Sequence, residues 1–210
     1  MKRLILTVMV SSLVLLIACA SAVTDGEEVA SPGKITLDDA LDILEVSFLL
    51  PSNFENIDAA SEGLSNADLE LGQDFSEVQV FFSEDDPSQL IYHVIGIIES
   101  RVEAASFDRT IEDDLAMEAL IKEALEAGAI EAGITIEIPS VTVTHPNIGD
   151  VAIYGEGNIE SYGLILGFRT LWFRINKVYY FGTSLNWSSD EVSLEVIAEE
   201  IEKRISKYSQ

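Results

Sequence analysis

Two apolar runs separated by the dipeptide Asn176-Lys177 constrain this fold more than any other feature of the sequence. The runs, Leu164 to Ile175 and Val178 to about Asn186, are rich in aromatic and β-branched residues, which favour strands. A two-residue connection between such runs is typical of a tight β-hairpin. The chain is therefore expected to contain an antiparallel sheet with this hairpin inside it.

The hairpin also predicts which side chains lie opposite one another. Counting outward from the turn pairs Trp172 with Phe181 and Phe173 with Tyr180. One of the two faces must be core. The other is expected to be covered by a helix, or else to form an open aromatic groove.

The remaining segments alternate between strand-like and helix-like patterns. Leu90 to Ile98 is apolar in both alternating sets, which indicates a central strand covered on both sides. The apolar stripes place Leu115 on the inner face of one helix and Val196, Ile197, Ile201 and Ile205 on the inner face of the last helix. Gly155 to Asn158 is expected to be a loop. Helices are predicted from Leu37 to about Leu50, from Ile111 to about Ala127 and from about Asp190 to Lys207, and further strands over Val78 to Phe82, Ile134 to Thr144 (interrupted by Pro139, as in an edge strand) and Val151 to Tyr154.

This element order predicts an α+β fold with a single antiparallel sheet of about six strands, flanked by three helices. Residues 34–210 are expected to form one globular domain, which is an ordinary size for a chain of 210 residues.

The charge is strongly one-sided. Twelve Lys and Arg residues stand against 37 Asp and Glu residues, a formal charge of −25. A nucleic-acid binder needs a basic surface to neutralise phosphates, and so does a protein that docks on anionic lipids through a basic patch, so the charge argues against both classes. Residues 35–100 hold fifteen of the acids and no Lys or Arg. Solubility explains this run of acidic residues, and binding of a cation or a basic partner is the alternative. No spacing typical of a calcium loop occurs, so no metal is expected, and no cofactor is expected either.

The first eighteen residues have the features of an export signal. Lys2 and Arg3 precede a mainly apolar run, Leu4 to Ile17, which is shorter than the roughly 20 residues that span a bilayer. The stretch Leu16-Ile17-Ala18-Cys19 then resembles the lipobox of bacterial lipoproteins. An ordinary secretory signal cleaved at Ala20 or Ala22 is the alternative.

The lipobox resemblance implies that residues 1–18 are removed and that Cys19 carries palmitate-type acyl chains. The protein would then be anchored in the cell membrane, facing outside the cytoplasm, with residues 19–33 as a small, polar tether. Because Cys19 is the single cysteine of the chain, no disulfide is expected despite export.

The order of elements over residues 34 to 208 is similar to the Mog1/PsbP-like fold. It also resembles extracytoplasmic sensor-type domains of bacterial lipoproteins. The resemblance to sensor-type domains implies a binding role outside the cytoplasm.

Candidate binding residues cluster in the late hairpin, where residues 151–187 carry two acids and three bases. Interface hot spots favour Trp, Tyr and Arg. An open groove here, with an arginine at each end, would suit an apolar or anionic ligand or a partner strand. The candidates are Arg169, Trp172, Arg174, Tyr179 and Tyr180.

No catalytic motif occurs. There is no G-x-S-x-G sequence, and His93 and His145 lie in contexts too different for a shared base or zinc site. The sequence therefore predicts a non-enzymatic binding domain, anchored by its lipid, whose partner is a protein or a small ligand. A cell-envelope hydrolase with an unmarked acidic site is the alternative, and an accessory subunit of a membrane complex is a third possibility.

Overall fold

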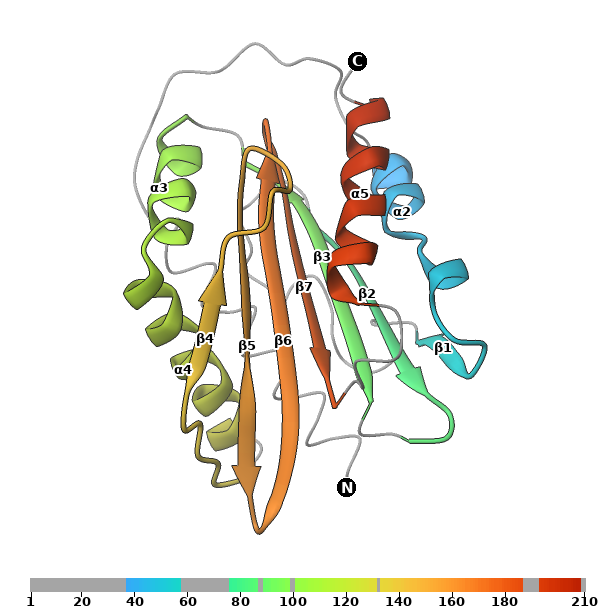
Figure 1. The fold of residues 1–210 in the computed structure, drawn as a ribbon. Coiled ribbons are helices and arrows are strands. Elements are labelled where there is room, and N and C mark those ends of the chain that lie inside the picture. Colours follow the sequence, from blue (N-terminus) through green and yellow to red (C-terminus); the bar gives the residue numbers. More distant parts are fainter. Residues whose placement is uncertain are drawn as a thin grey trace.

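A computed structural model describes residues 37–57, 76–86, 89–98, 101–131, 133–186 and 193–208. Their strands form one antiparallel sheet in the order β1-β2-β3-β7-β6-β5-β4. Figure 1 shows this sheet with α3 and α4 on one side and α2 and α5 on the other. The α+β class and the single antiparallel sheet are confirmed, with seven strands and four α-helices among the described residues where about six and three were predicted.

The bounds of the elements are as follows. The helices are α2 (Leu37–Leu44), α3 (Arg101–Ile111), α4 (Asp114–Glu131) and α5 (Leu194–Tyr208), with a short 3₁₀ turn at Ser47–Leu49. The strands are β1 (Phe54–Ile57), β2 (Ser76–Ser83), β3 (Leu90–Ile97), β4 (Val141–Thr144), β5 (Val151–Ser161), β6 (Leu164–Ile175) and β7 (Val178–Leu185).

The predicted hairpin forms with its predicted register. Trp172 lies opposite Phe181, and Phe173 lies opposite Tyr180. The ring centroids of both pairs are 4.9 Å apart. Asn176 adopts a φ of 52°, as a tight two-residue turn requires. β3 also occupies its predicted central place, between β2 and β7.

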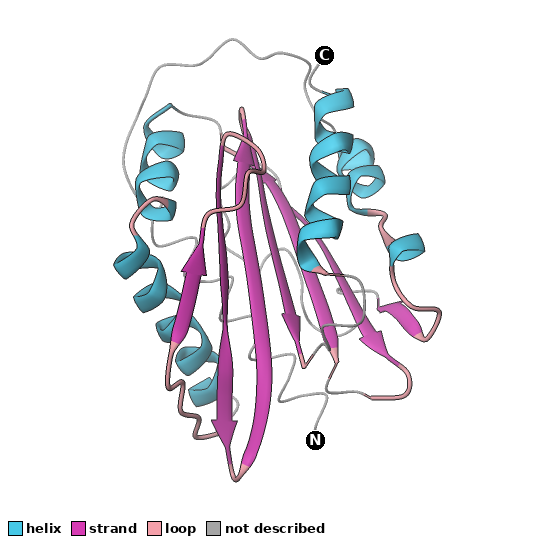
Figure 2. Ribbon diagram, in the orientation of Figure 1, coloured by secondary structure: helices cyan, strands magenta, loops and turns pink. Residues whose placement is uncertain are grey.

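Each face of the sheet has its own apolar core. On the α4 face, α3 and α4 cover side chains that include Tyr92, Trp172 and Phe181. On the α5 face, α2 and α5 cover side chains that include Phe173 and Tyr180. Figure 2 shows the sheet as one layer between these helices. The middle of the sheet is buried on both faces, so the alternative of a helix-covered hairpin is correct.

The predicted helix from Ile111 to about Ala127 corresponds to α4, which begins at Asp114. Its expected first residue, Ile111, instead ends α3, a helix that was not predicted. The chain breaks at Asp113, whose side chain caps the second helix by accepting a hydrogen bond from the Ala116 amide at 3.0 Å. The break resets the helical phase, so Leu115 is 78% exposed, contrary to prediction, and Met117 is buried in its place. Val196 of α5 is likewise exposed, whereas Ile197 and its neighbours on that stripe are buried.

The segment from Gly155 to Asn158 is a strand, although the sequence predicted a loop. β5 continues through both glycines because it pairs with β4 on one side and β6 on the other. Neither glycine position has room for a side chain. A Cβ on Gly155 would lie 2.8 Å from Ile121 of α4, and one on Gly157 would lie 2.6 Å from the Ser140 carbonyl oxygen. β1 was not predicted at all, and α2 ends at Leu44 rather than near Leu50.

Cys19, the tether and the predicted start of the last helix, Asp190 to Val192, lie outside the described residues. No helix in the described part of the chain is long and apolar enough to cross a membrane.

Candidate functional site

A row of four polar side chains crosses the α5 face. Thr142 of β4 pairs with Glu156 of β5, Glu156 with Arg169 of β6, and Arg169 with Ser184 of β7. Residues directly opposite each other in antiparallel strands point to the same face. These four therefore form a continuous polar floor. They line a pocket of about 340 Å³, which we call the Arg169 pocket.

A missing side chain opens the pocket. Next to the polar row, Asn158 lies opposite Gly167. A Cβ added to Gly167 would meet only the Asn158 Oδ1 atom, at 3.9 Å, so the space in front of this glycine is open. Ser140 completes the rim.

The pocket combines both charges with neutral hydrogen-bonding groups. Arg169 Nε lies 4.0 Å from Glu156 Oε2, with the Arg169 side chain mostly buried and the Glu156 side chain half-exposed. The Tyr154 hydroxyl donates to Glu156 Oε2 at 3.4 Å. Burial, followed by the nearby Glu156 charge, raises the pKa of Tyr154, so this phenol stays neutral and donates. Such a lining can bind a polar ligand that carries charges of both signs.

The lining contains few kinds of ionisable side chain. Among the described residues, Glu156 is its single carboxylate, and neither a histidine nor a cysteine joins it. No group of three or more metal-ligating side chains occurs in the described part of the chain. Glu55 and Glu84 do form a carboxylate pair, whose hydrogen bond raises the pKa of Glu84, but this pair is exposed and is not part of the pocket lining.

The five predicted binding residues do not share one surface. Trp172, Arg174 and Tyr179 point to the α4 face, whereas Arg169 and Tyr180 point to the α5 face. Only Arg169 reaches the pocket. An open aromatic groove with Arg169 and Arg174 at its ends is therefore wrong, because residues five apart in a strand point in opposite directions.

Trp172 is a core residue. Its side chain is 4% exposed and packs edge-on against Phe181. Its indole nitrogen donates to the Thr170 hydroxyl at 2.7 Å, which satisfies the one polar atom of the ring. Tyr179 and Tyr180 are also buried, one on each face. A closed face offers these rings no ligand, so their burial assigns them to packing.

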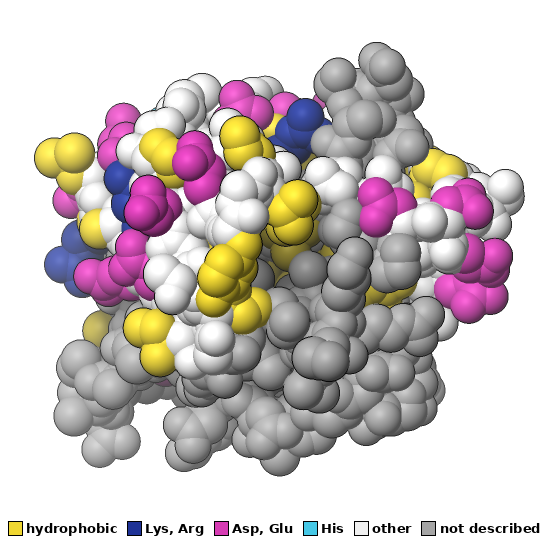
Figure 3. All heavy atoms as spheres, turned by 90° about the horizontal axis from the view of Figure 1, so that it is seen from below, with side chains coloured by type: hydrophobic (Ala, Val, Ile, Leu, Met, Phe, Trp, Pro, Cys, Tyr) yellow, Lys and Arg dark blue, Asp and Glu magenta, His cyan; other side chains and the backbone are white. Residues whose placement is uncertain are grey.

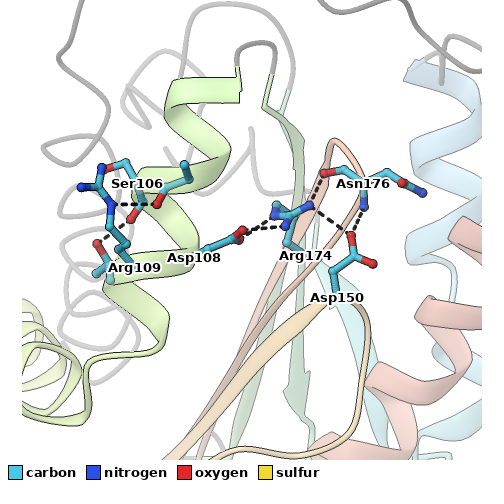
Figure 4. A network of polar contacts seen from close by, with 8 residues as sticks. Ser106, Asp108, Arg109, Asp150, Arg174 and Asn176 are labelled. Atoms are coloured by element: carbon cyan, nitrogen blue, oxygen red, sulfur yellow. Dashed lines mark hydrogen bonds and ion pairs between the residues drawn. The ribbon is translucent and has the colours of Figure 1, made fainter.

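Arg174 joins three segments at the end of the sheet opposite the β5–β6 turn (Figure 4). Its guanidinium donates to both carboxylate oxygens of Asp108 in α3, each at 2.7 Å, and to Asp150 at 3.1 Å. Asp150 also accepts from the backbone amide of Asn176 at 2.6 Å. The Asp108 hydrogen bonds raise the pKa of Arg174. This bidentate pairing fixes α3 to the β6–β7 turn, which is a structural role.

The two histidines lie far from each other in different environments. His93 is fully buried on the α5 face, and its Nδ1 atom lies 2.6 Å from the Tyr180 hydroxyl. Burial lowers the pKa of His93 to about 3. His145 is exposed and bonds Asp114 through Nε2 at 2.8 Å, and this bond raises its pKa. His93 is therefore neutral at pH 7, whereas His145 keeps its proton to a higher pH than an unperturbed histidine does.

Sequence reasoning missed Thr142, Glu156, Asn158 and Ser184. The available signal was the alternation Tyr154, Glu156, Asn158, which is the pattern of a strand with one polar face. The glycines between these residues hid it. Scans of protein-family models and of curated proteins found no match to this chain.

Proposed function

We propose that this protein is a lipid-anchored, extracytoplasmic domain that binds a polar ligand in the Arg169 pocket. The observation that carries the proposal is the pocket itself: a polar floor drawn from four strands and open in front of Gly167. Packing of a sheet face does not require a partly buried arginine beside a carboxylate and two hydroxyls. Such a set instead complements the donors and acceptors of a ligand.

Binding is favoured over hydrolysis by the composition of the lining. A hydrolase of the two-carboxylate kind needs two acids facing each other across the substrate. The described lining supplies Glu156 alone. Arg169 and the surrounding hydroxyl and amide groups are suited to recognition, because none of them is an activated nucleophile or a base.

The anchor is the second part of the proposal. The support for it is the charged start, the short apolar run and the lipobox-like sequence before Cys19. An acidic domain is repelled by anionic lipids, so acyl chains on Cys19 would have to hold it at the membrane. Palmitate labelling with membrane fractionation tests this. Wild-type protein is expected to carry label and to sediment with membranes, and Cys19→Ala is expected to lose both properties; unlabelled wild-type protein would refute the anchor.

Binding is tested with a pocket-filling variant. Gly167→Leu adds a side chain where a Cβ meets nothing closer than 3.9 Å, so the domain is expected to fold with the pocket filled. The full-length protein, purified in mild detergent from its own membranes, is measured by native mass spectrometry. A bound species is expected on the wild type and on the distant control Asn147→Ala, but neither on Gly167→Leu nor on Arg169→Ala. The same species on all four proteins would exclude the pocket as its site.

A further inference from the structure

The turn between β5 and β6 projects an apolar tip from one end of the sheet. Tyr162, Leu164 and Ile165 are 85%, 66% and 64% exposed. β7 pairs with β6 only from Phe168 onward, so the ribbon extends past its neighbour on that side. Figure 1 shows this tip as the lowest point of the sheet. Large apolar side chains gathered on a projecting turn mark a contact surface.

The turn itself holds an aromatic ring where a small residue is expected. Tyr162 adopts a φ of 48° and Gly163 a φ of 78°, as in a two-residue hairpin turn. Asn, Asp and Gly are preferred at the first position, and a bulky residue there is disfavoured. The corresponding position of the β6–β7 turn is Asn176, which follows the rule. An unfavourable tyrosine at the very tip indicates that the ring is needed there.

The tip is uncharged within an acidic protein. Residues 161–168 contain no Asp, Glu, Lys or Arg, although the chain carries 37 acids. Seen from below, hydrophobic side chains gather in the middle of this end and acidic ones lie to either side (Figure 3). Aliphatic residues beside a tyrosine are typical of protein surfaces that enter the membrane interface.

The Arg169 pocket lies just behind the tip. Between the tip pair Ser161–Leu164 and the pocket pair Asn158–Gly167 there are three residue steps, which span about 10 Å. A tip buried to the boundary between head groups and acyl chains would therefore bring the pocket to the level of the head groups.

From these observations we infer that the tip of the β5–β6 turn enters the outer surface of the membrane. We infer further that the Arg169 pocket binds the head group of a zwitterionic phospholipid. Arg169 donates to the phosphate, since a guanidinium has five donors to share among its partners. Glu156 accepts from the primary ammonium group of an ethanolamine head group, which has N–H donors. A head group without net charge is the one that a protein of charge −25 can approach.

The inference rests on the proposed anchor. Seventeen residues lie between Cys19 and Leu37. Acyl chains on Cys19 would therefore keep the domain within a short length of chain from the bilayer.

Insertion is tested with a fluorophore. Leu164→Cys or, as the matched control at the opposite end, Asn147→Cys is labelled with an environment-sensitive dye in the full-length protein, because an acylated Cys19 does not react. The proteins are reconstituted into phosphatidylcholine–phosphatidylethanolamine vesicles that contain doxyl-labelled lipid. Position 164 is expected to be quenched and position 147 to remain in water. An additional Ile165→Asp change is expected to weaken quenching at 164 about tenfold.

Ligand chemistry is tested with glycerophosphoethanolamine, which is the head group without its acyl chains. Saturable NMR shifts are expected at the Gly167 and Arg169 amides, lost in Gly167→Leu and kept in Asn147→Ala. Inorganic phosphate is expected to be at least tenfold weaker; equal binding of phosphate would overturn the head-group assignment.

The outcomes separate the two proposals. An unlabelled Cys19 in the palmitate experiment removes the anchor. A labelled Cys19 with position 164 in water overturns the tip insertion alone. Quenching that needs native membranes and fails in protein-free vesicles would identify a membrane protein, rather than lipid, as the occupant of the tip.

Discussion

Lowering the pH should destabilise the fold through His93. This imidazole is fully buried, and burial holds its pKa at about 3 in the folded protein. In the unfolded chain a histidine has a pKa of about 6.5. Below pH 6.5 the unfolded state therefore binds a proton at His93 that the folded state does not bind. The stabilisation is fully present above pH 6.5 and is lost as the pH falls toward 3.

The size of the effect follows from the same two pKa values. Each pH unit below 6.5 should lower the free energy of unfolding by about 1.4 kcal/mol, which gives roughly 2.5 kcal/mol between pH 7.5 and pH 4.5. This is a large share of the stability of an ordinary domain. Because His93 is fully buried, solvent does not screen this contribution to the free energy of unfolding.

A matched double variant isolates this contribution from the other titrating groups. His93→Phe with Tyr180→Phe removes both partners of the buried hydrogen bond, so neither polar atom is left orphaned. Burial raises the pKa of Tyr180, so its phenol does not titrate in this range. The carboxylates and His145 are common to both proteins, so their titrations cancel in the difference.

The assay is urea unfolding followed by circular dichroism on both proteins from pH 7.5 to pH 4.5. The stability difference is expected to be constant above pH 7 and to shift by about 1.4 kcal/mol per unit below 6.5, in favour of the variant. An imidazole NMR signal without a midpoint above pH 4.5 is expected for His93. Parallel stability curves, or a His93 midpoint near 6.5, would refute the reasoning.

Three further predictions follow from packing and charge. Trp172→Ala should lower the free energy of unfolding by about 3–5 kcal/mol, measured by urea unfolding, because it empties a buried site; a loss under 1 kcal/mol would show that the ring is not core. Ile201→Asp should unfold the domain, since it places a charge in the core on the α5 face, whereas the exposed control Glu199→Lys should change stability by less than about 0.5 kcal/mol; equal midpoints would mean that the inner face of α5 is misplaced. His145→Asn removes a histidine whose pKa is raised by its hydrogen bond to Asp114. The stabilisation that His145 gives the folded state is present below pH 6.5 and is lost as the pH rises through its folded pKa. A difference in the free energy of unfolding between wild type and variant that stays constant from pH 6 to 8.5 would contradict this.

Local patterns predicted the parts of the fold that depend on neighbouring residues. The β6–β7 hairpin is the clearest example, because a two-residue turn fixes the register and period-two alternation does the rest. The apolar stripe of α5 was also predicted at Ile201 and Ile205, both of which are buried. In each case the interacting residues are close in the chain.

Errors arose where one residue changed the phase of a pattern. Asp113 interrupts a helix and starts another, which rotates Leu115 out of the core. Gly155 and Gly157 resemble loop residues by composition, yet both pair with β4 and β6 as strand residues. Glycine is needed there because Ile121 and Ser140 occupy the space that a side chain would fill. These packing partners are distant in the sequence, so a local pattern does not reveal them.

The candidate site could not be predicted for the same reason. Its polar floor needs the register of four strands at once, from Thr142 to Ser184, and only the β6–β7 part of that register is local. Single polar residues in separate strands resemble ordinary surface positions until the pairing lines them up.

The two arginines of β6 show how strictly the strand geometry then decides a role. Arg169 and Arg174 are of one residue type on one strand, and both were predicted to bind a ligand. Their separation is odd, so they face opposite layers. Arg174 donates hydrogen bonds to the carboxylates of Asp108 in α3 and of Asp150, so its guanidinium is held in one position. Arg169 faces the side that α5 leaves uncovered, beside a half-exposed glutamate and an empty glycine position. The face of the sheet to which each side chain points, rather than its chemistry, therefore gives Arg174 a structural role and makes Arg169 a candidate for ligand binding.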